Sequence, residues 1–254
     1  MFRRFTEKRR RYMKIGIISD VHGNLPALEA VLNALEKEDC IRILCGGDLV
    51  GYGAYPNECV DMIRERSITC IRGNHDDMMM HVGRESRLRP EVRESIRWTR
   101  SQLSAEKRRW LGSLPRSLHC AGVDLVHASH LLKPRWHYVM DMRSVLANFV
   151  FQHATISFNG HTHLPLLALH RHGQKPKMLM LRNMALPPHH RYLINVGSVG
   201  QPRDNNPDAA FVTFETRTRE VAIHRVDYDV DAAQKGIRDA GLPERFAERL
   251  GQGR

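Results

Sequence analysis

The stretch KIGIISDVHGN, residues 14–24, decides the fold that we predict for this chain. Its first half is a β-branched run typical of a buried strand, and the polar residues Asp20 and His22 follow where that run ends. Asn24 is a suitable N-cap for a helix over residues 25–38, whose apolar residues share one helical stripe. A strand that leads through polar side chains into an amphipathic helix predicts an α/β sheet with a functional site at the carboxyl ends of its strands.

The same order recurs twice further along the chain. Residues 41–45 form an apolar run that ends at Gly46-Gly47-Asp48, and residues 68–71 form another that ends at Gly73-Asn74-His75-Asp76. Residues 56–65, which open on a proline, are predicted to be the helix between these two strands. Strand–helix–strand alternation predicts a parallel sheet in this half, so the polar residues should meet along one edge.

The second half of the chain is predicted to be richer in strands. Two helices, at 90–103 and 104–113, precede it, and we place them outside the sheet or in a small helical cap within residues 78–118. The remaining strands are expected at 118–120, 123–126, 155–158, 166–170, 177–181, 192–196, 210–215 and 221–226, in antiparallel or mixed pairing, followed by helices at 230–240 and 244–250. No repeat or low-complexity linker interrupts the sequence, so we predict a single domain over residues 13–254.

The composition is that of a globular protein, with 42% hydrophobic and 26% charged residues. No apolar run is long enough to cross a bilayer, and we therefore predict no membrane span. The five cysteines show no CxxC spacing. Their odd number and scattered positions argue against a disulfide framework and favour a cytoplasmic location.

The net charge of +11 raises the question of nucleic-acid binding. Residues 1–14 hold seven basic residues against Glu7, so they carry +6 and leave only +5 for the other 240 residues. We expect residues 1–12 to be a disordered basic leader, or to precede a true first residue at Met13. An arm that binds nucleic acid or acidic lipid is the alternative. Nucleic acid is not an expected partner, because no aromatic platform for base stacking is visible.

Four short motifs carry the candidate chemistry, and each follows an apolar strand run. They are Asp20-Val21-His22, Gly46-Gly47-Asp48, Gly73-Asn74-His75-Asp76 and Gly160-His161-Thr162-His163. Carboxylate, amide and imidazole donors without a thiolate suit a pair of divalent metals that hydrolyse phosphate esters. Each motif alone is a weak signal, because these residue types also occur in turns, caps and surfaces. His161 and His163 must lie on a turn to serve one metal, or each must bind a different one.

The order of these motifs, with a later histidine before the last of them, resembles the calcineurin-like metallophosphoesterase superfamily. The segments GGDLVGYG (46–53), PNECV (56–60) and NVGSVGQPRD (195–204) resemble a small bacterial phosphodiesterase branch of it, as do Tyr228-Asp229 and Gly241-Leu242-Pro243. The resemblance extends over residues 13–250. It implies an α/β fold, a four-layer α/β/β/α sandwich of two mixed β-sheets flanked by helices.

Carried over residue by residue, the resemblance implies two metal ions bridged by Asp48. One ion would also be held by Asp20, His22 and His163, and the other by Asn74, His127 and His161. His127 lacks the neighbouring glycine that is usual in the family, and His130 is the alternative ligand. Manganese is the expected metal, with iron, zinc or nickel as alternatives, because mixed oxygen and nitrogen donors suit all four.

The resemblance gives His75 the role of general acid for the leaving oxygen, or of hydrogen-bond donor to the phosphoryl group. Asp76 would orient the His75 imidazole, or merely cap the next helix. Asn74 and His75 are also expected to contact the substrate. Arg203 either reaches the substrate phosphate or forms an ion pair with Asp204 or another acid.

These observations favour hydrolysis of phosphodiesters or phosphomonoesters by attack of a metal-bridging hydroxide. A dinucleoside-polyphosphate or nucleotide pyrophosphatase is the main alternative, and a non-catalytic scaffold of the same fold is the alternative from another class. The scaffold is disfavoured because His75 and every expected ligand type are present. The partner is expected to be a small phosphate ester or nucleotide, selected by residues 78–118 and the loops at 131–150 and 171–191. Nothing in the sequence indicates the oligomeric state.

Overall fold

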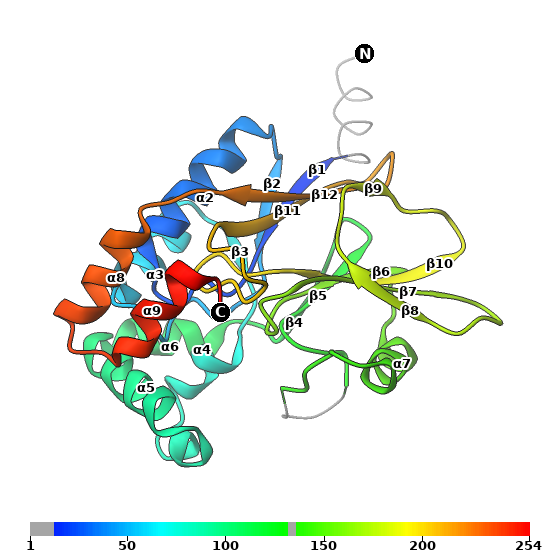
Figure 1. Ribbon diagram of the computed structural model, residues 1–254. Coiled ribbons are helices and arrows are strands. Elements are labelled where there is room, and N and C mark those ends of the chain that lie inside the picture. The colour runs from blue at the N-terminus through cyan, green and yellow to red at the C-terminus, as the bar shows by residue number, and fades with distance from the viewer. Residues whose placement is uncertain (1–12, 132–135) are drawn as a thin grey trace.

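Two six-stranded β-sheets face each other at the centre of the molecule (Figure 1). The structure is a computed structural model that describes residues 13–131 and 136–254. The first sheet contains, in spatial order, β3 (Thr69–Cys70), β2 (Arg42–Cys45), β1 (Lys14–Ile18), β11 (Ala209–Glu215), β12 (Glu220–Val226) and β9 (Met184–Ala185). The second contains β4 (Ser117–Cys120), β5 (Val123–Val126), β6 (Ile156–Asn159), β10 (His190–Val196), β7 (Pro165–Arg171) and β8 (Lys177–Met180).

Helices cover the outer faces of both sheets. Those beside the first sheet, at the left of Figure 1, include α2 (Leu25–Lys37), α3 (Pro56–Glu65), α8 (Val230–Asp239) and α9 (Glu244–Gln252). Between β3 and β4 the chain forms α4 (Asn74–Met78), the 3-10 helix η1 (Arg84–Arg87), α5 (Pro90–Gln102) and α6 (Ala105–Ser113). Helix α7 (Met142–Phe151) packs on the second sheet. Both sheets are mixed, and the predicted four-layer sandwich is confirmed.

Strand β1 shows how an alternating strand supplies two layers of core. Ile15 and Ile17 are buried in the cluster between the sheets, which also contains Phe158 and Ile194 of the second sheet. Ile18 faces the opposite way and joins the cluster under the helices. Because β1 pairs parallel to β2, and β2 parallel to β3, the carboxyl ends of all three strands lie at one edge.

The two helical layers have separate cores. On the second sheet, Val145 and Phe149 of α7 pack against Ala168 and Leu193. On the first sheet, Ile96 of α5 and Leu111 of α6 belong to the same buried cluster as α2 and α3. Of the two expected placements of these helices, outside the sheet or in a small cap, the shared core favours the first.

Most elements lie where the sequence predicts them, including the hairpin at 117–126 and the pairing of β7 with β8. The sequence does not predict that β11 and β12 return to the first sheet, where β11 pairs antiparallel to β1. It also misses α4, α7 and the two-residue strand β9. Residues 1–12, expected to be a leader, lie outside the described residues. Among the described residues, no helix combines the length and apolar character needed to cross a membrane.

Candidate metal centre

The loops that follow β1, β2, β5 and β6 bring the candidate ligands together. Asp20 and His22 follow β1, Asp48 follows β2, His127 follows β5, and His161 and His163 follow β6. Backbone hydrogen bonds join the first two loops, since the N–H of Asp20 donates to the Gly47 oxygen and that of His22 to the Asp48 oxygen, both at 2.9 Å. All six side chains are buried. The carboxyl ends of the strands thus converge on one site, as predicted for this type of sheet.

Five candidate ligands lie in loops with left-handed backbone geometry. The φ angle is 57° at Asp20, 51° at His22, 53° at Asp48, 69° at His161 and 61° at His163. Each such residue costs about 1–2 kcal/mol relative to an ordinary conformation. Residues of this kind cluster at functional sites, where the surrounding structure holds them in place. His161 and His163 therefore lie on a turn, which is one of the two arrangements expected from the sequence.

Asp20, His22 and His163 form a first cluster, in which one ligand atom from each lies within 4.8 Å of the others. The Nε2 atom of His163 is 3.3 Å from Asp20 Oδ1, and that of His22 is 3.8 Å from the same oxygen. The two Nε2 atoms are 3.1 Å apart.

The tautomers of these two histidines show that the cluster fits a metal ion. His22 Nδ1 is 3.2 Å from the carbonyl oxygen of Val50, and His163 Nδ1 is 2.6 Å from that of Gln201. A carbonyl oxygen only accepts, so each Nδ1 donates and each neutral ring presents a lone pair at Nε2. Burial lowers the pKa of both rings and keeps them neutral. Two lone pairs at 3.1 Å repel each other, whereas a cation accepts both.

Asp48, His127 and His161 form a second cluster, again within 4.8 Å. The Nε2 atom of His127 is 3.3 Å from Asp48 Oδ2 and 3.0 Å from Asn74 Oδ1, while its Nδ1 is 2.8 Å from the carbonyl oxygen of Gly46. The Nε2 atom of His161 is buried and has no hydrogen-bond partner among the described residues. This donor set, with oxygen and imidazole ligands, also fits a metal ion.

The Asp48 carboxylate lies between the two clusters. Its Oδ2 is 3.7 Å from His22 Nε2 and 3.3 Å from His127 Nε2. Its Oδ1 accepts a hydrogen bond from the backbone N–H of His75 at 2.8 Å. Burial alone would lower the pKa of His127, but the Asp48 carboxylate raises it to about 10. Asp48 therefore attracts positive charge at the point where both clusters meet.

His130, the alternative ligand, lies outside these clusters. Its Nε2 is 2.7 Å from Ser157 Oγ, and its backbone N–H donates to Asn148 Oδ1 at 2.9 Å. His127 alone of the two histidines approaches Asp48 and Asn74. The geometry favours His127 as the ligand.

Metal analysis of two alanine variants distinguishes these histidines. We expect His127→Ala to lose the metal ion of the second cluster, because it removes an imidazole that faces Asp48 and Asn74. We expect His130→Ala to bind as much metal as the unmodified protein. The measurement is bound metal per chain after gel filtration, and metal loss in His130→Ala alone would reverse the assignment.

His75 lies beside both clusters and forms a third group of candidate ligand atoms with His22 and Asp48. Its Nδ1 has no hydrogen-bond partner among the described residues. It packs against Gly51, where φ is 90° and where a Cβ atom would lie 2.3 Å from that nitrogen. Glycine is therefore needed at position 51 for its conformation and for the close approach of the imidazole.

The pKa of His75 bears on whether it acts as a general acid or as a hydrogen-bond donor. Burial lowers its pKa to about 4, and the Asp48 carboxylate only partly offsets this effect. The imidazole is neutral at pH 7, so it offers a hydrogen-bond donor rather than a proton. Of the two roles expected from the sequence, this favours a donor to the phosphoryl group over a general acid.

Asp76 does not orient His75, which corrects the expectation from the sequence. Its Oδ2 accepts from the backbone N–H groups of Asp48 at 2.8 Å and Gly73 at 2.9 Å, and its Oδ1 accepts from that of Leu49 at 3.0 Å. Asp76 lies in the first turn of α4, and its bond to the N–H of Gly73 stabilises the start of that helix, whereas the alternative expectation made Asp76 itself the cap of the next helix. Burial raises the pKa of Asp76 to about 7. Its carboxylate fixes the loop that carries Asp48 rather than an imidazole.

A cavity of about 360 Å³ lies next to the metal clusters. It is lined by Tyr52, Asn74, His75, Met78, Leu88, Arg89, Glu91, Val92, Tyr138, Arg203, Arg245, Phe246 and Arg249. Residues from 78–118 and 131–150 line it, as expected for a specificity region. The expectation for 171–191 is wrong for this cavity, because none of its residues takes part, and α9 does so instead.

Arg203 faces this cavity without an acidic partner. Its Nη2 donates to Gln201 Oε1 at 2.8 Å, and its guanidinium lies 5.9 Å from the centre of the Tyr52 ring. Asp204, the expected ion-pair partner, pairs with Arg225. No carboxylate within the described part of the chain forms an ion pair with Arg203, so the guanidinium can contact a bound phosphate.

Several residues at the site belong to none of the sequence motifs, so no motif identifies them. The Tyr138 ring stacks on His161, with ring centres 4.1 Å apart. Because Tyr138 is 52% exposed, it lines the cavity and does not pack in the core. Arg245 and Arg249 lie far along the chain from every motif. Their spacing of four residues places them on one helical face, which is the signal that could have identified them.

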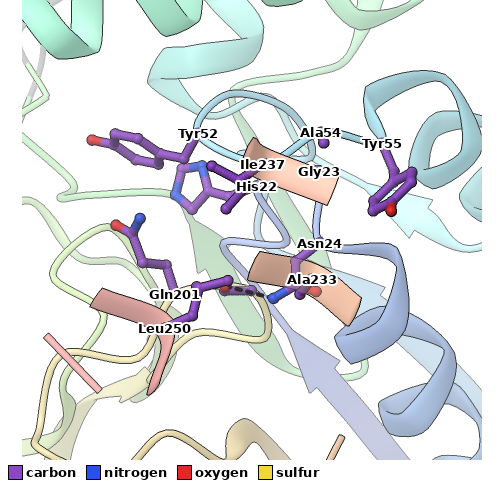
Figure 2. Close-up of a pocket in the computed structure, with 12 residues that line it drawn as sticks. His22, Gly23, Asn24, Tyr52, Ala54, Tyr55, Gln201, Ala233, Ile237 and Leu250 are labelled. Carbon is purple, nitrogen blue, oxygen red and sulfur yellow. Dashed lines mark hydrogen bonds between the residues drawn. The ribbon is translucent and has the colours of Figure 1, made fainter. Parts of the chain in front are cut away.

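Figure 2 shows a second cavity that His22 lines. Its volume of about 10 Å³ has room for no more than a water molecule. The Tyr52 ring lies beside the His22 imidazole, with ring centres 4.7 Å apart. Asn24 caps α2, as predicted, by accepting from the Ala27 N–H at 3.2 Å. Its amide also donates to the Gly200 oxygen at 2.9 Å, which ties the 195–204 segment to the first motif.

Comparison with known proteins agrees with this geometry. A metallophosphoesterase from Sphaerobacter thermophilus has a similar structure, with a TM-score of 0.81, 38% identity, and coverage of 96% of this chain and 100% of that one. A hypothetical protein from Pyrococcus horikoshii has the same fold, with a TM-score of 0.75, 20% identity, and coverage of 95% and 98%. An uncharacterized protein from Methanocaldococcus jannaschii is 35% identical over 247 residues, which are 94% of this chain and 98% of the relative.

The family model of the calcineurin-like phosphoesterase superfamily domain matches residues 13–219. That range includes all the aspartate and histidine residues of the two clusters. Proteins of this family depend on metal ions, in agreement with the aspartate and histidine clusters described above. Since the match covers most of the sequence and the same motifs form the buried clusters, the chain belongs to the calcineurin-like phosphoesterase superfamily.

Proposed function

We propose that this chain hydrolyses phosphodiesters with the help of two metal ions. Asp48 is shared between the ions, and the remaining ligands are Asp20, His22 and His163 for the first and Asn74, His127 and His161 for the second. The observation that carries the proposal is the 3.1 Å approach of two neutral Nε2 atoms, from His22 and His163, in a buried site. Manganese is the proposed metal, with iron, zinc and nickel as alternatives that the same donors accept.

Two metal ions in such a site supply an activated water molecule and neutralise charge on the phosphoryl oxygens. The protein's own groups position the substrate beside them. Asn74 directs Oδ1 toward His127, which leaves its amide N–H groups for a phosphoryl oxygen in the cavity. Neutral His75 donates to the phosphoryl or leaving oxygen, and Arg203 contacts the phosphate from the cavity wall. Asp76 keeps the Asp48 loop fixed during these contacts.

A scaffold without activity is a weaker alternative. A scaffold has no need for His75, yet this residue is held beside both clusters by Gly51 packing and by a backbone hydrogen bond to Asp48. The cavity also leads to His75 and Asn74 from outside the clusters. Both features favour an enzyme.

A hydrolysis screen tests the proposed function. We expect protein freed of metal with EDTA to be inactive, and added Mn²⁺ to restore turnover of bis-p-nitrophenyl phosphate above that of p-nitrophenyl phosphate. Metal should also raise the free energy of unfolding, by about 2.7 kcal/mol at a free concentration 100 times the dissociation constant. Thermal unfolding with and without Mn²⁺ measures this second effect. Metal-dependent stabilisation with no turnover of either ester would favour the scaffold.

A further inference from the structure

Four arginine side chains line the cavity beside His75. Arg203 lies next to the metal clusters, Arg89 precedes α5, and Arg245 and Arg249 come from α9. The last two are four residues apart and share one face of the helix. The cavity volume of about 360 Å³ is in the range of small-molecule sites. Three separate parts of the chain thus bring basic groups to one small-molecule cavity.

Acidic groups do not balance these charges. Glu91 is the acidic residue among those that line the cavity, and its Oε1 is 4.0 Å from Arg245 Nη1, with both side chains exposed. Arg249 Nε donates to the backbone oxygen of Arg254 at 2.6 Å. Within the described residues, neither Arg203 nor Arg249 forms an ion pair with an aspartate or glutamate side chain. Four arginines against one glutamate leave an excess of positive charge among the side chains that line the cavity.

These cations also act on one another. Burial lowers the pKa of Arg249, and the positive charges of Arg203, Arg245 and Arg89 lower it further. The buried Nε of Arg203 has no hydrogen-bond partner in the described part of the chain. A cavity that concentrates one sign of charge attracts ligands of the opposite sign.

We propose that Arg89, Arg245 and Arg249 form a second anion subsite, which binds a phosphoryl group of the substrate other than the one that is hydrolysed. The proposal rests on the proposed function, in which Asn74 and His75 contact the hydrolysed phosphate in the same cavity. The substrate class is then a phosphate ester or anhydride with at least one further phosphoryl group, as in a nucleoside polyphosphate.

Guanidinium chemistry favours a phosphoryl group over other anions. Each guanidinium presents paired N–H donors that match two phosphate oxygens, and such charge-assisted bonds are stronger than neutral ones. A terminal phosphoryl group carries more negative charge than a carboxylate, so it offsets more of the excess positive charge. The neighbouring apolar residues Leu88, Val92 and Phe246 leave room for an organic part of the same substrate.

A series of inorganic phosphates of increasing length tests the subsite. Phosphate, pyrophosphate and tripolyphosphate are compared as competitive inhibitors of bis-p-nitrophenyl phosphate hydrolysis, with free Mn²⁺ held constant by a metal buffer. In the unmodified protein we expect the inhibition constant to fall by about tenfold or more from phosphate to tripolyphosphate. In the double variant Arg245→Gln, Arg249→Gln this fall should shrink to about threefold or less. The KM for bis-p-nitrophenyl phosphate, which has a single phosphoryl group, should change by a smaller factor than the inhibition constant for tripolyphosphate.

The matched control is Arg171→Gln, which removes one positive charge from an exposed position on β7 outside the cavity. In this variant the inhibition constant should fall from phosphate to tripolyphosphate as much as in the unmodified protein. An equal fall in the double variant and the unmodified protein would overturn the subsite while leaving the proposed function intact. If the unmodified protein hydrolyses no phosphodiester, the proposed function fails, and calorimetry of tripolyphosphate binding to the same variants decides the subsite. Equal dissociation constants there would overturn it.

Discussion

Replacement of Asp48 by asparagine is expected to remove both metal ions and to lower phosphodiester turnover by at least about a thousandfold. The physical reason is that one carboxylate serves both clusters, with Oδ2 3.7 Å from His22 Nε2 and 3.3 Å from His127 Nε2. Asparagine keeps the size of the side chain and an oxygen for the His75 N–H, but it removes the negative charge. The measurement is metal content per chain together with turnover of bis-p-nitrophenyl phosphate.

Asp20→Asn is the matched control for this variant. Asp20 approaches His22 and His163 of the first cluster. Its replacement should therefore weaken metal binding at that cluster and leave the metal ion of the second cluster bound. A circular dichroism spectrum and an unfolding curve establish that both variants are folded. If Asp48→Asn retains two metal ions, Asp48 is not shared between them.

His75→Ala is expected to have the opposite profile, with both metal ions retained and kcat lowered by about 10²–10³-fold. The imidazole lies in the cavity wall and is neutral, so its loss removes a hydrogen-bond donor aimed at the phosphoryl group and leaves the other ligands in place. Metal content and the kinetic parameters at saturating Mn²⁺ separate these effects. A drop in bound metal would instead make His75 a ligand, in agreement with its place beside His22 and Asp48.

The variant Asp76→Asn tests whether Asp76 fixes the loop that carries Asp48 or orients the His75 imidazole. Because Asp76 accepts from the backbone of Asp48 and Leu49, we expect this variant to bind metal more weakly and to recover kcat when metal is saturating. A kcat that stays as low as that of His75→Ala at saturating metal would restore the role in orienting His75.

The sequence predicts that the polar residues of the motifs meet, because each motif is local. A buried strand, a glycine and a polar residue occur within a few positions, and the strand fixes where Asp20 and Asp48 lie. The turn at His161 and His163 is a local requirement of the same kind. Fold class follows from the same alternation of strand and helix. These features depend on neighbours in the chain, so a pattern can report them.

The features that escape prediction depend on distant contacts. Two of the three backbone partners of Asp76 belong to a loop 27 and 28 residues away. Nothing in its own motif distinguishes a carboxylate that faces an imidazole from one that faces backbone N–H groups. The return of β11 and β12 to the first sheet, and the packing of α8 against α2 and α9, carry Arg245 and Arg249 to the cavity. No local pattern encodes that path.

The left-handed loops have a consequence for how such proteins diverge. Glycine, and to a lesser degree asparagine, adopts the φ values found at Asp20, His22, Asp48, His161 and His163 with less strain than the residues now there. Substitution of these positions by glycine also removes buried carboxylates and facing lone pairs, which are unfavourable in a protein without metal. Under the proposed function, the residues that would bind metal are therefore also residues with strained backbone. On that proposal, selection for activity keeps these residues in spite of the strain, and a lineage released from that selection can drift toward an inert descendant of the same architecture.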